Sequence, residues 1–312
     1  MTSRKTGYVF SYVNPDTDGV CSSIAYAFLA RATGRDEYVP VVFGNLNKET
    51  KFVLRHFGVP APTVITVVPL DSAIAIVDTH HKNQLPADTH FANVVEVIDH
   101  HPAGNIELFP NARIQNERVG AVATLIAERI KNVSAGPSVE IYGILAAAII
   151  SNTLNFGAPS TTDRDHGAFN WLHNYVNIGP EFIRGMFEAR SNIGEMTTEE
   201  VLLSDYKEFV LGNVRVGISQ LETLSLSNFL ARGDLFTSID GVRRSKALDH
   251  FIFNGVDIEN HTSMIVVVEA KTQRVLEVAL GAKFDDKCTS FERILLRKTD
   301  IVPQLRVFFE RN

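Results

Sequence analysis

Acidic and imidazole side chains gather in three short segments of the sequence, and together they have the chemistry of a site for divalent metal ions. The segments are Asn14–Asp18, which holds two aspartates, Asp78–His81, and Asp99–His101. Hard carboxylate oxygens mixed with imidazole nitrogens suit Mn²⁺ or Mg²⁺, with Co²⁺ as a further candidate, and shared carboxylates suit a pair of ions. The pattern therefore predicts a site for one or two divalent ions.

Each of these segments directly follows a run of residues that is typical of a β-strand. The runs are Tyr8–Val13, Ala73–Val77 and Val94–Ile98, and the last two are almost continuously apolar, as expected of strands covered on both faces. A lone aspartate at such a position more often caps the next helix than binds a metal. Because the carboxyl ends of parallel strands meet at one edge of a sheet, three such segments predict a common site.

The other elements of the first half alternate between strand and helix, which favours a mostly parallel sheet with helices on both faces. We expect a strand at Val39–Phe43 and helices at Val20–Arg31, Lys48–Phe57, Val119–Lys131, Val139–Ile150, Asp163–Val176 and Pro180–Ala189. The predicted fold class is α/β, with an N-terminal, mostly parallel sheet flanked by helices and a smaller C-terminal α/β domain.

The pattern changes at the polar stretch Ser191–Thr198, which is the best candidate for a linker. We therefore expect one domain at residues 1–190, a hinge at 191–198 and a second domain at 199–312. In the second domain the expected elements are strands at Lys207–Leu211 and Val214–Gln220, a mixed helical region over Ser225–Phe253, and a hairpin of Ser263–Ala270 with Val275–Leu280.

Composition bounds the partners and the location of the protein. The chain has 312 residues, with 36 acidic against 30 basic and a formal charge of −6, so it has no excess of cations with which to bind nucleic acid. The apolar run Ile144–Ile150 is far shorter than the roughly 20 residues of a membrane span. Two distant cysteines, Cys21 and Cys288, form no disulfide framework, and the default location is a reducing cytoplasm.

The motifs resemble those of the DHH phosphoesterase superfamily and, within it, the family II (manganese-dependent) inorganic pyrophosphatases. The similar segments occur in the family's order and cover nearly the whole chain. They are Asn14–Asp18, Cys21–Ala27, Val77-Asp78, Ile98–Pro102, Ala148–Ser151 with Pro159–Asp163, Asp205–Phe209, and Arg297-Lys298 followed by Ile301–Pro303.

The resemblance implies a homodimeric hydrolase that cuts inorganic pyrophosphate into two phosphates with a metal-activated water, in a cleft between a DHH domain and a DHHA2-like domain. The metal ligands that it implies are Asp16, Asp18, Asp78 and His100. Asp99 would orient a histidine, and His101 would protonate or bond to the leaving phosphate. The cations implied to neutralise the phosphates are Lys207, Arg297 and Lys298.

Two positions depart from the family pattern. A histidine is expected where Tyr12 stands, and an aspartate is expected where Asn152 stands. A phenol with a pKa of about 10 is a poor metal ligand beside imidazole, and the amide keeps one carbonyl oxygen but loses a negative charge. His80 and His81 could supply a replacement ligand. The simpler interpretation is that they are solvated loop histidines, because two residues of extended chain carry a side chain about 6–7 Å onward.

These departures leave three hypotheses. The enzyme stays active and its preference shifts toward Mg²⁺ over softer metals. Alternatively, the site binds only one ion tightly, so that hydrolysis is slow or the substrate is a polyphosphate or a small nucleotide. The third hypothesis is a catalytically degenerate protein that binds an anion as a sensor. The surviving set of cations favours catalysis.

Overall fold

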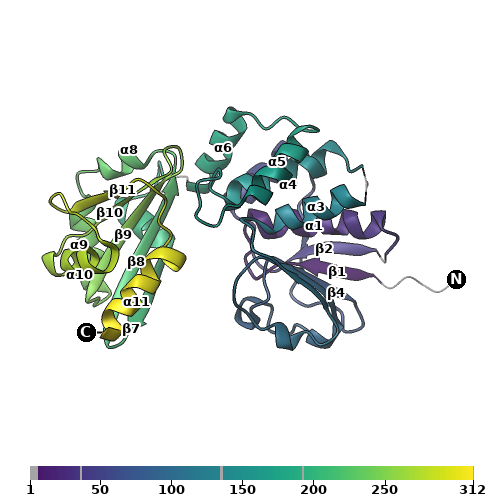
Figure 1. Ribbon diagram of the computed structural model, residues 1–312, viewed down its shortest axis with the longest axis horizontal. Coiled ribbons are helices and arrows are strands. Elements are labelled where there is room, and N and C mark those ends of the chain that lie inside the picture. Colours follow the sequence, from purple (N-terminus) through teal and green to yellow (C-terminus); the bar gives the residue numbers. More distant parts are fainter. Residues whose placement is uncertain (1–5, 36, 134–135, 192, 312) are drawn as a thin grey trace. The chain divides into compact units, whose positions relative to one another are not determined.

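The computed structural model describes residues 6–35, 37–133, 136–191 and 193–311 (Figure 1). The chain forms two compact units, the first made of Met1–Phe156 and Ser160–Ala189 and the second of Gly157–Pro159 and Arg190–Asn312. The predicted linker runs from the last residue of helix α6 (Pro180–Ser191) to the first residue of helix α7 (Thr198–Ser204). Within that linker, Asn192 lies outside the described residues.

The first unit is built on a six-stranded sheet in which all neighbouring strands are parallel, as predicted, in the order β3-β2-β1-β4-β5-β6. The strands are β1 Gly7–Phe10, β2 Tyr38–Val42, β3 Thr63–Val64, β4 Ile74–Val77, β5 Val94–Asp99 and β6 Arg113–Asn116. The edge strands β3 and β6 were not predicted, because one has two residues and the other is mostly polar. The strand order reverses between β1 and β4, and ligands bind at the carboxyl ends of such a pair.

Helices cover one face of this sheet in two layers. The helices are α1 Thr17–Ala32, α2 Lys48–His56, α3 Val122–Asn132, α4 Val139–Asn152, α5 Asp163–His173 and α6. Helices α1 and α3 pack on the strands, and α4 packs behind them (Figure 1). Helix α1 is therefore enclosed between the sheet and α4, which explains why 13 of its 16 residues are buried.

Among the residues that the structure describes, no long helix covers the opposite face, although the alternating pattern predicted helices on both sides. That face is packed by Val68, Leu85 and Phe109, which come from the connections between strands. The connections after β4 and β5 form only the short 3₁₀ helices η1 (Lys82–Gln84), η2 (Phe91–Asn93) and η3 (Ile106–Leu108).

The second unit has a five-stranded sheet in the order β11-β10-β9-β8-β7, in which β8 and β9 are parallel and the other pairs antiparallel. The strands are β7 Tyr206–Leu211, β8 Val214–Thr223, β9 His250–Asp257, β10 Thr262–Val266 and β11 Cys288–Phe291. The helices are α7, α8 Leu226–Leu230, α9 Leu235–Ser245, α10 Ala270–Leu280, the π-helical turn η4 Arg297–Ile301 and α11 Val302–Arg311.

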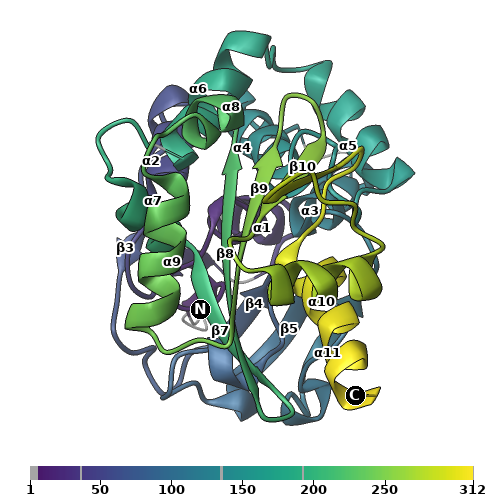
Figure 2. The same cartoon turned by 90° about the vertical axis from the view of Figure 1, so that its left-hand side faces the viewer.

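Alternate residues of the second sheet point to two hydrophobic cores. Phe251 and Phe253 of β9 join a cluster with α7, α8 and α9, whereas Ile252 joins a cluster with α10 and α11. This is the period of two that a strand imposes on its side chains. Figure 2 shows β8 and β9 side by side, with α9 and α11 on either side of them. The helical region predicted over Ser225–Phe253 is accordingly wrong at its end, because residues from His250 onward form β9.

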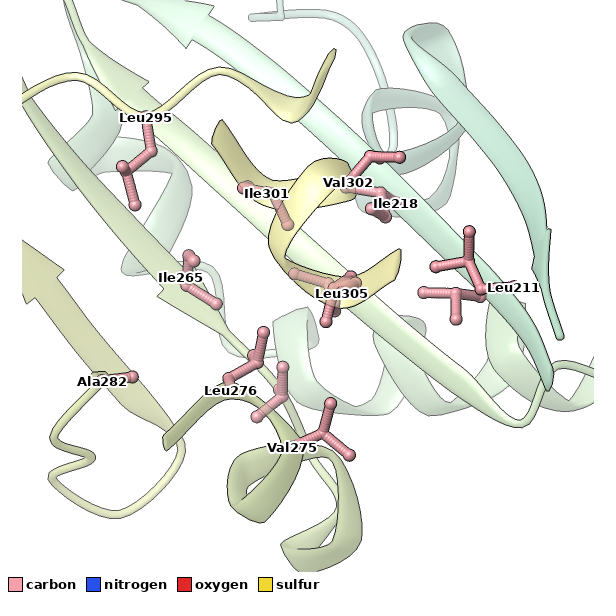
Figure 3. Packing of buried hydrophobic residues seen from close by; sticks show 13 residues of the cluster. Leu211, Ile218, Ile265, Val275, Leu276, Ala282, Leu295, Ile301, Val302 and Leu305 are labelled. Carbon is pink, nitrogen blue, oxygen red and sulfur yellow. The ribbon is translucent and has the colours of Figure 1, made fainter. Parts of the chain in front are cut away.

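The predicted hairpin of Ser263–Ala270 with Val275–Leu280 is also wrong. Strand β10 ends at Val266, and the second arm is the helix α10. Thr272, Val275 and Leu276 are buried on one side of α10, and this spacing of three and four is helical. Figure 3 shows Val275 and Leu276 in the same cluster as Leu305 of α11. Packing against α11 therefore selects a helix over a strand for this segment, a choice that its β-branched residues left open.

Candidate metal centre

The ends of β4 and β5 bring acidic and imidazole side chains together at one edge of the first sheet, whereas Asp16 and Asp18, which follow β1, are not members of this group. Each of Asp78, Asp99, His100 and His101 offers a ligand atom, and these four atoms lie within 4.8 Å of one another. Asp78 follows β4 directly and has a positive φ of 66°, a backbone conformation that costs energy in a residue other than glycine. Such a conformation points its carboxylate toward the loops after β1 and β5 rather than along the strand.

Asp78 and His100 form the centre of this group. His100 Nε2 lies 3.2 Å from Asp78 Oδ1, yet both atoms are buried and neither has a hydrogen bond of proper geometry among the described residues. The other ring nitrogen, His100 Nδ1, lies 2.8 Å from the carbonyl oxygen of Val119. A carbonyl can only accept, so Nδ1 carries a proton, and Nε2 is the ring nitrogen that faces Asp78. A buried carboxylate oxygen and Nε2 this close need a cation between them, which is a proton in the metal-free protein or a metal ion that displaces that proton.

Asp18 and Asp16 add two more carboxylates at the start of α1. Asp18 is fully buried, and its oxygens accept hydrogen bonds from the backbone N–H groups of Val122 (2.7 Å) and Ala123 (2.9 Å) at the start of α3. Asp16 caps α1, where its Oδ1 accepts from the N–H of Gly19 at 3.1 Å. Each carboxylate oxygen has two lone pairs, so both residues keep ligand capacity.

The electrostatics of these carboxylates favour a bound cation. Burial, followed by the charges of Asp16 and Asp18, raises the pKa of Asp78 well above its ordinary value. Burial likewise raises the pKa of Asp18 to about 7, against the opposing effect of His100. For His100 burial acts downward, but the Asp78 carboxylate outweighs it and raises the pKa to about 10. Two buried carboxylic acids that resist ionisation side by side, Asp78 and Asp18, fit a divalent cation, because its charge removes their mutual repulsion.

Tyr12 and Asn152, the two departures from the expected ligands, both make hydrogen bonds here. The Tyr12 hydroxyl accepts from the N–H of Asp16 at 3.1 Å. Burial and the charges of Asp16 and Asp78 raise its pKa well above 10, so it stays a neutral phenol. Asn152, the last residue of α4, donates its Nδ2 to the carbonyl of Gly120 at 2.8 Å. An aspartate could not make that bond, because a carboxylate has no proton to donate.

Asp99 holds two imidazole rings. Its Oδ1 accepts from His101 Nδ1 at 2.8 Å, and the same oxygen accepts from the backbone N–H groups of His100 and His101. Its Oδ2 pairs with Nδ1 of His80. Although burial opposes ionisation, these bonds and the charge of His101 lower the pKa of Asp99 to about 2. With both oxygens engaged, Asp99 is placed to orient His101 rather than to bind a metal.

His80 is not a solvated loop histidine, so that interpretation is wrong. The side chain is 2% exposed, packs on Gly104 with no room for a Cβ there, and bonds to Asp99. It is also absent from the cluster of potential ligands found among the described residues. The sequence signal for this pairing was weak, because a histidine three residues after one strand and an aspartate that ends the next could meet only if the loop after the first strand turned inward. His81 is half-buried beside it, with the two rings stacked at 5.3 Å.

The second unit brings its three predicted cations close together. The charges of Arg297 and Lys298 add to partial burial in lowering the pKa of Lys207 on β7. The three cations differ in exposure, however. Lys207 and Lys298 are exposed, whereas Arg297 is 6% exposed and its guanidinium bonds to the Asp205 carboxylate (2.7 Å) and to the Ile218 carbonyl. The two lysines are therefore the cations most open to an anion.

The fold and the site together define a DHH phosphoesterase. Residues 7–149 match the model of the DHH family, N-terminal domain, and residues 184–308 match the DHHA2 domain. A manganese-dependent inorganic pyrophosphatase of Methanothrix thermoacetophila is 31% identical over 307 residues, which cover 97% of this chain and 98% of that protein. The chain belongs to the family of manganese-dependent (family II) inorganic pyrophosphatases.

Solved structures agree with this assignment. A crystal structure described as that of a candidate family II inorganic pyrophosphatase of Methanococcus jannaschii has a TM-score of 0.71 and 30% identity, covering 97% of this chain and 99% of that one. An exopolyphosphatase-related protein of Bacteroides fragilis has a TM-score of 0.52 at 14% identity, covering 99% of this chain and 93% of that one, and shares the fold. No helix in the described parts of the chain is both long and apolar enough to cross a membrane.

Proposed function

We propose that this protein hydrolyses inorganic pyrophosphate to two phosphates and that it needs a divalent metal ion to do so. The observation that carries the proposal is the buried pair of Asp78 Oδ1 and His100 Nε2, 3.2 Å apart and without hydrogen bonds of proper geometry. The similarity along 97% of the chain to a manganese-dependent inorganic pyrophosphatase supports the choice of substrate.

Asp16, Asp18, Asp78 and His100 would hold the ion or ions. A bound divalent ion supplies Lewis acidity, which lowers the pKa of a coordinated water and neutralises phosphate oxygens. Three carboxylates and one imidazole suit Mn²⁺ or Mg²⁺, and Co²⁺ less well. The phenol of Tyr12 and the amide of Asn152 replace an imidazole and a carboxylate, so the second of two ions would be bound more weakly than the first.

The residues around this centre hold protons and position the substrate. Asp99 fixes Nδ1 of His101, so Nε2 is the nitrogen left to protonate or hydrogen-bond the leaving phosphate. In the second unit, Lys207 and Lys298 neutralise phosphate oxygens, and Arg297 holds the backbone on which Lys298 stands. We further propose that residues 191–198 act as a hinge and that the protein is a cytoplasmic homodimer.

A phosphate-release assay with Mg²⁺, Mn²⁺ and Co²⁺ in turn tests the proposal, and Asp78→Asn is the matched loss-of-charge control. We expect pyrophosphate turnover with Mn²⁺ or Mg²⁺ that falls by at least about a hundredfold in the variant, because the central ligand loses its charge. The substitutions at Tyr12 and Asn152 favour a second candidate, an altered substrate such as polyphosphate or a small nucleotide, or an anion sensor. No turnover with any metal, together with retained pyrophosphate binding, would establish the sensor instead.

A further inference from the structure

A second charged cavity lies in the first unit, at the other end of α1 from the metal centre. It has a volume of about 350 Å³ and is lined mainly by Leu29, Arg35, Glu96, Arg113, Arg129 and Val133. This volume is at the lower end of the range for small-molecule sites. Asp16 caps the first turn of α1 and Thr33 caps its last, with 16 helical residues between them. Glu96 of the cavity and Asp99 lie three residues apart on β5, about 10 Å at 3.3 Å per residue, and none of the lining residues is a predicted metal ligand, so a molecule bound there takes no part in the hydrolysis.

The charges around this cavity leave it positive. Glu96 is buried and accepts hydrogen bonds from Tyr26 (2.7 Å), Arg35 (2.6 Å) and Arg129 (2.6 Å). Burial opposes its ionisation, but the bonds from Arg129, Tyr26 and Arg35 prevail and lower its pKa, so Glu96 stays an anion. One carboxylate thus faces three guanidinium groups. The described lining of the cavity carries two positive charges in excess, in a chain whose net charge is −6.

Two of the arginines have donors that the described residues do not use. The Nη2 atom of Arg129 is buried and has no hydrogen-bond partner among them. Arg113 is exposed, and its side chain makes no ion pair or hydrogen bond within the described residues. In the β5–β6 register Arg113 is paired with Glu96, so the two side chains leave the same face of the sheet. Guanidinium groups with free donors are the usual partners of phosphate oxygens, which they bind in pairs.

We propose that this cavity binds the phosphate group of a small phosphorylated molecule, of about the size of a nucleoside monophosphate. Arg113 and Arg129 would hold the phosphate. Leu29 and the exposed Val133 offer an apolar wall for the organic part, which inorganic phosphate lacks. The position of the cavity, at the far end of a helix that begins among the metal ligands, makes it a regulatory site rather than a second active site.

Calorimetric titration of the full-length protein tests this proposal, with adenosine 5′-monophosphate, inorganic phosphate and adenosine as probes. Each titration is run with Mg²⁺ and again after chelation, so that binding at the metal centre is separated from binding here. We expect the monophosphate to bind in both conditions. Arg113→Gln should weaken that binding about tenfold, which is the effect of one charge-assisted hydrogen bond. Lys131→Gln, which removes the same charge from the same region without lining the cavity, should leave it unchanged.

The possible outcomes distinguish a site for an organic monophosphate from a site for the free phosphate ion, and both of these from failure of the proposal. If inorganic phosphate binds as tightly as the monophosphate, and if Arg113→Gln weakens both equally, the result supports a phosphate site that takes the free ion. Binding of adenosine alone, no binding of any probe at millimolar concentration, or binding that Arg113→Gln leaves intact would overturn the proposal. Because Arg113 is outside the metal centre, its variant should keep pyrophosphate turnover at the wild-type level, and the two proposals therefore succeed or fail separately.

Discussion

Replacing Asn152 by aspartate should have two opposite effects, a less stable metal-free protein and tighter metal binding. The amide of Asn152 donates to the carbonyl of Gly120 at 2.8 Å, and a carboxylate cannot. Gly120 lies two residues before Val122, whose N–H holds the buried carboxylate of Asp18. The new charge therefore enters a neighbourhood that already holds acids whose pKa values are raised, and only a cation compensates it.

The magnitudes follow from these contacts. A buried carbonyl that loses its donor destabilises a protein by about 1–3 kcal/mol, and repulsion between like charges adds to this. We expect the free energy of unfolding of the metal-free Asn152→Asp variant to fall by that amount or more. With Mn²⁺ bound, one additional anionic ligand should tighten binding by at least about tenfold, equivalent to about 1.4 kcal/mol.

Urea unfolding in the presence of a chelator measures the first effect, and calorimetric titration with Mn²⁺ and Mg²⁺ measures the second. Asn152→Ala is the matched control, because it removes the donor without adding a charge and should lose stability with no gain in affinity. Adding Tyr12→His to Asn152→Asp should raise the affinity for Mn²⁺ further. If the Asn152→Asp variant kept its metal-free stability and bound Mn²⁺ no more tightly, Asn152 would not face the metal centre. The match of Asn152 to the position at which the family has an aspartate would then be wrong.

Three further predictions test other parts of the structure. The folded-state pKa values of Asp18 and His100, about 7 and about 10, lie above their ordinary values, so the metal-free protein should lose stability as the pH rises between about 4, near the ordinary pKa of Asp18, and about 10, near the folded-state pKa of His100. Saturating Mn²⁺ should flatten that dependence in urea titrations, and equal stability of the metal-free protein at both pH values would contradict it. Lys298→Gln should raise the KM for pyrophosphate with little change in stability. Arg297→Gln should instead lower the urea midpoint by the equivalent of about 2–4 kcal/mol, because Asp205 loses its buried partner. Equal effects of the two substitutions on stability would refute the assignment of Lys298 to substrate binding and of Arg297 to structure. Gly104→Ala should destabilise the protein by about 1–3 kcal/mol by displacing His80, which a wild-type melting temperature would disprove.

The location of the candidate metal centre could be predicted from sequence because it depends on local patterns and one general rule. Short apolar runs indicate strands, and the side chains that follow parallel strands meet at one edge. Asp16, Asp78 and His100 satisfy that rule without any knowledge of the packing. The helix α10 could not be predicted in the same way, because Val275 and Leu276 suit a strand as well as a helix until α11 packs on them.

The sequence by itself determined the types of candidate ligand, their order and the sheet edge at which they lie, because these follow from residue type and strand periodicity. Only the tertiary structure decided how each group is used. It enclosed His80 against Asp99, 19 residues away in the chain, and turned Arg297 toward Asp205, 92 residues away. The partner of a buried polar group is set by which loops reach the same place, and burial makes that partner obligatory; residue spacing along a chain carries neither kind of information.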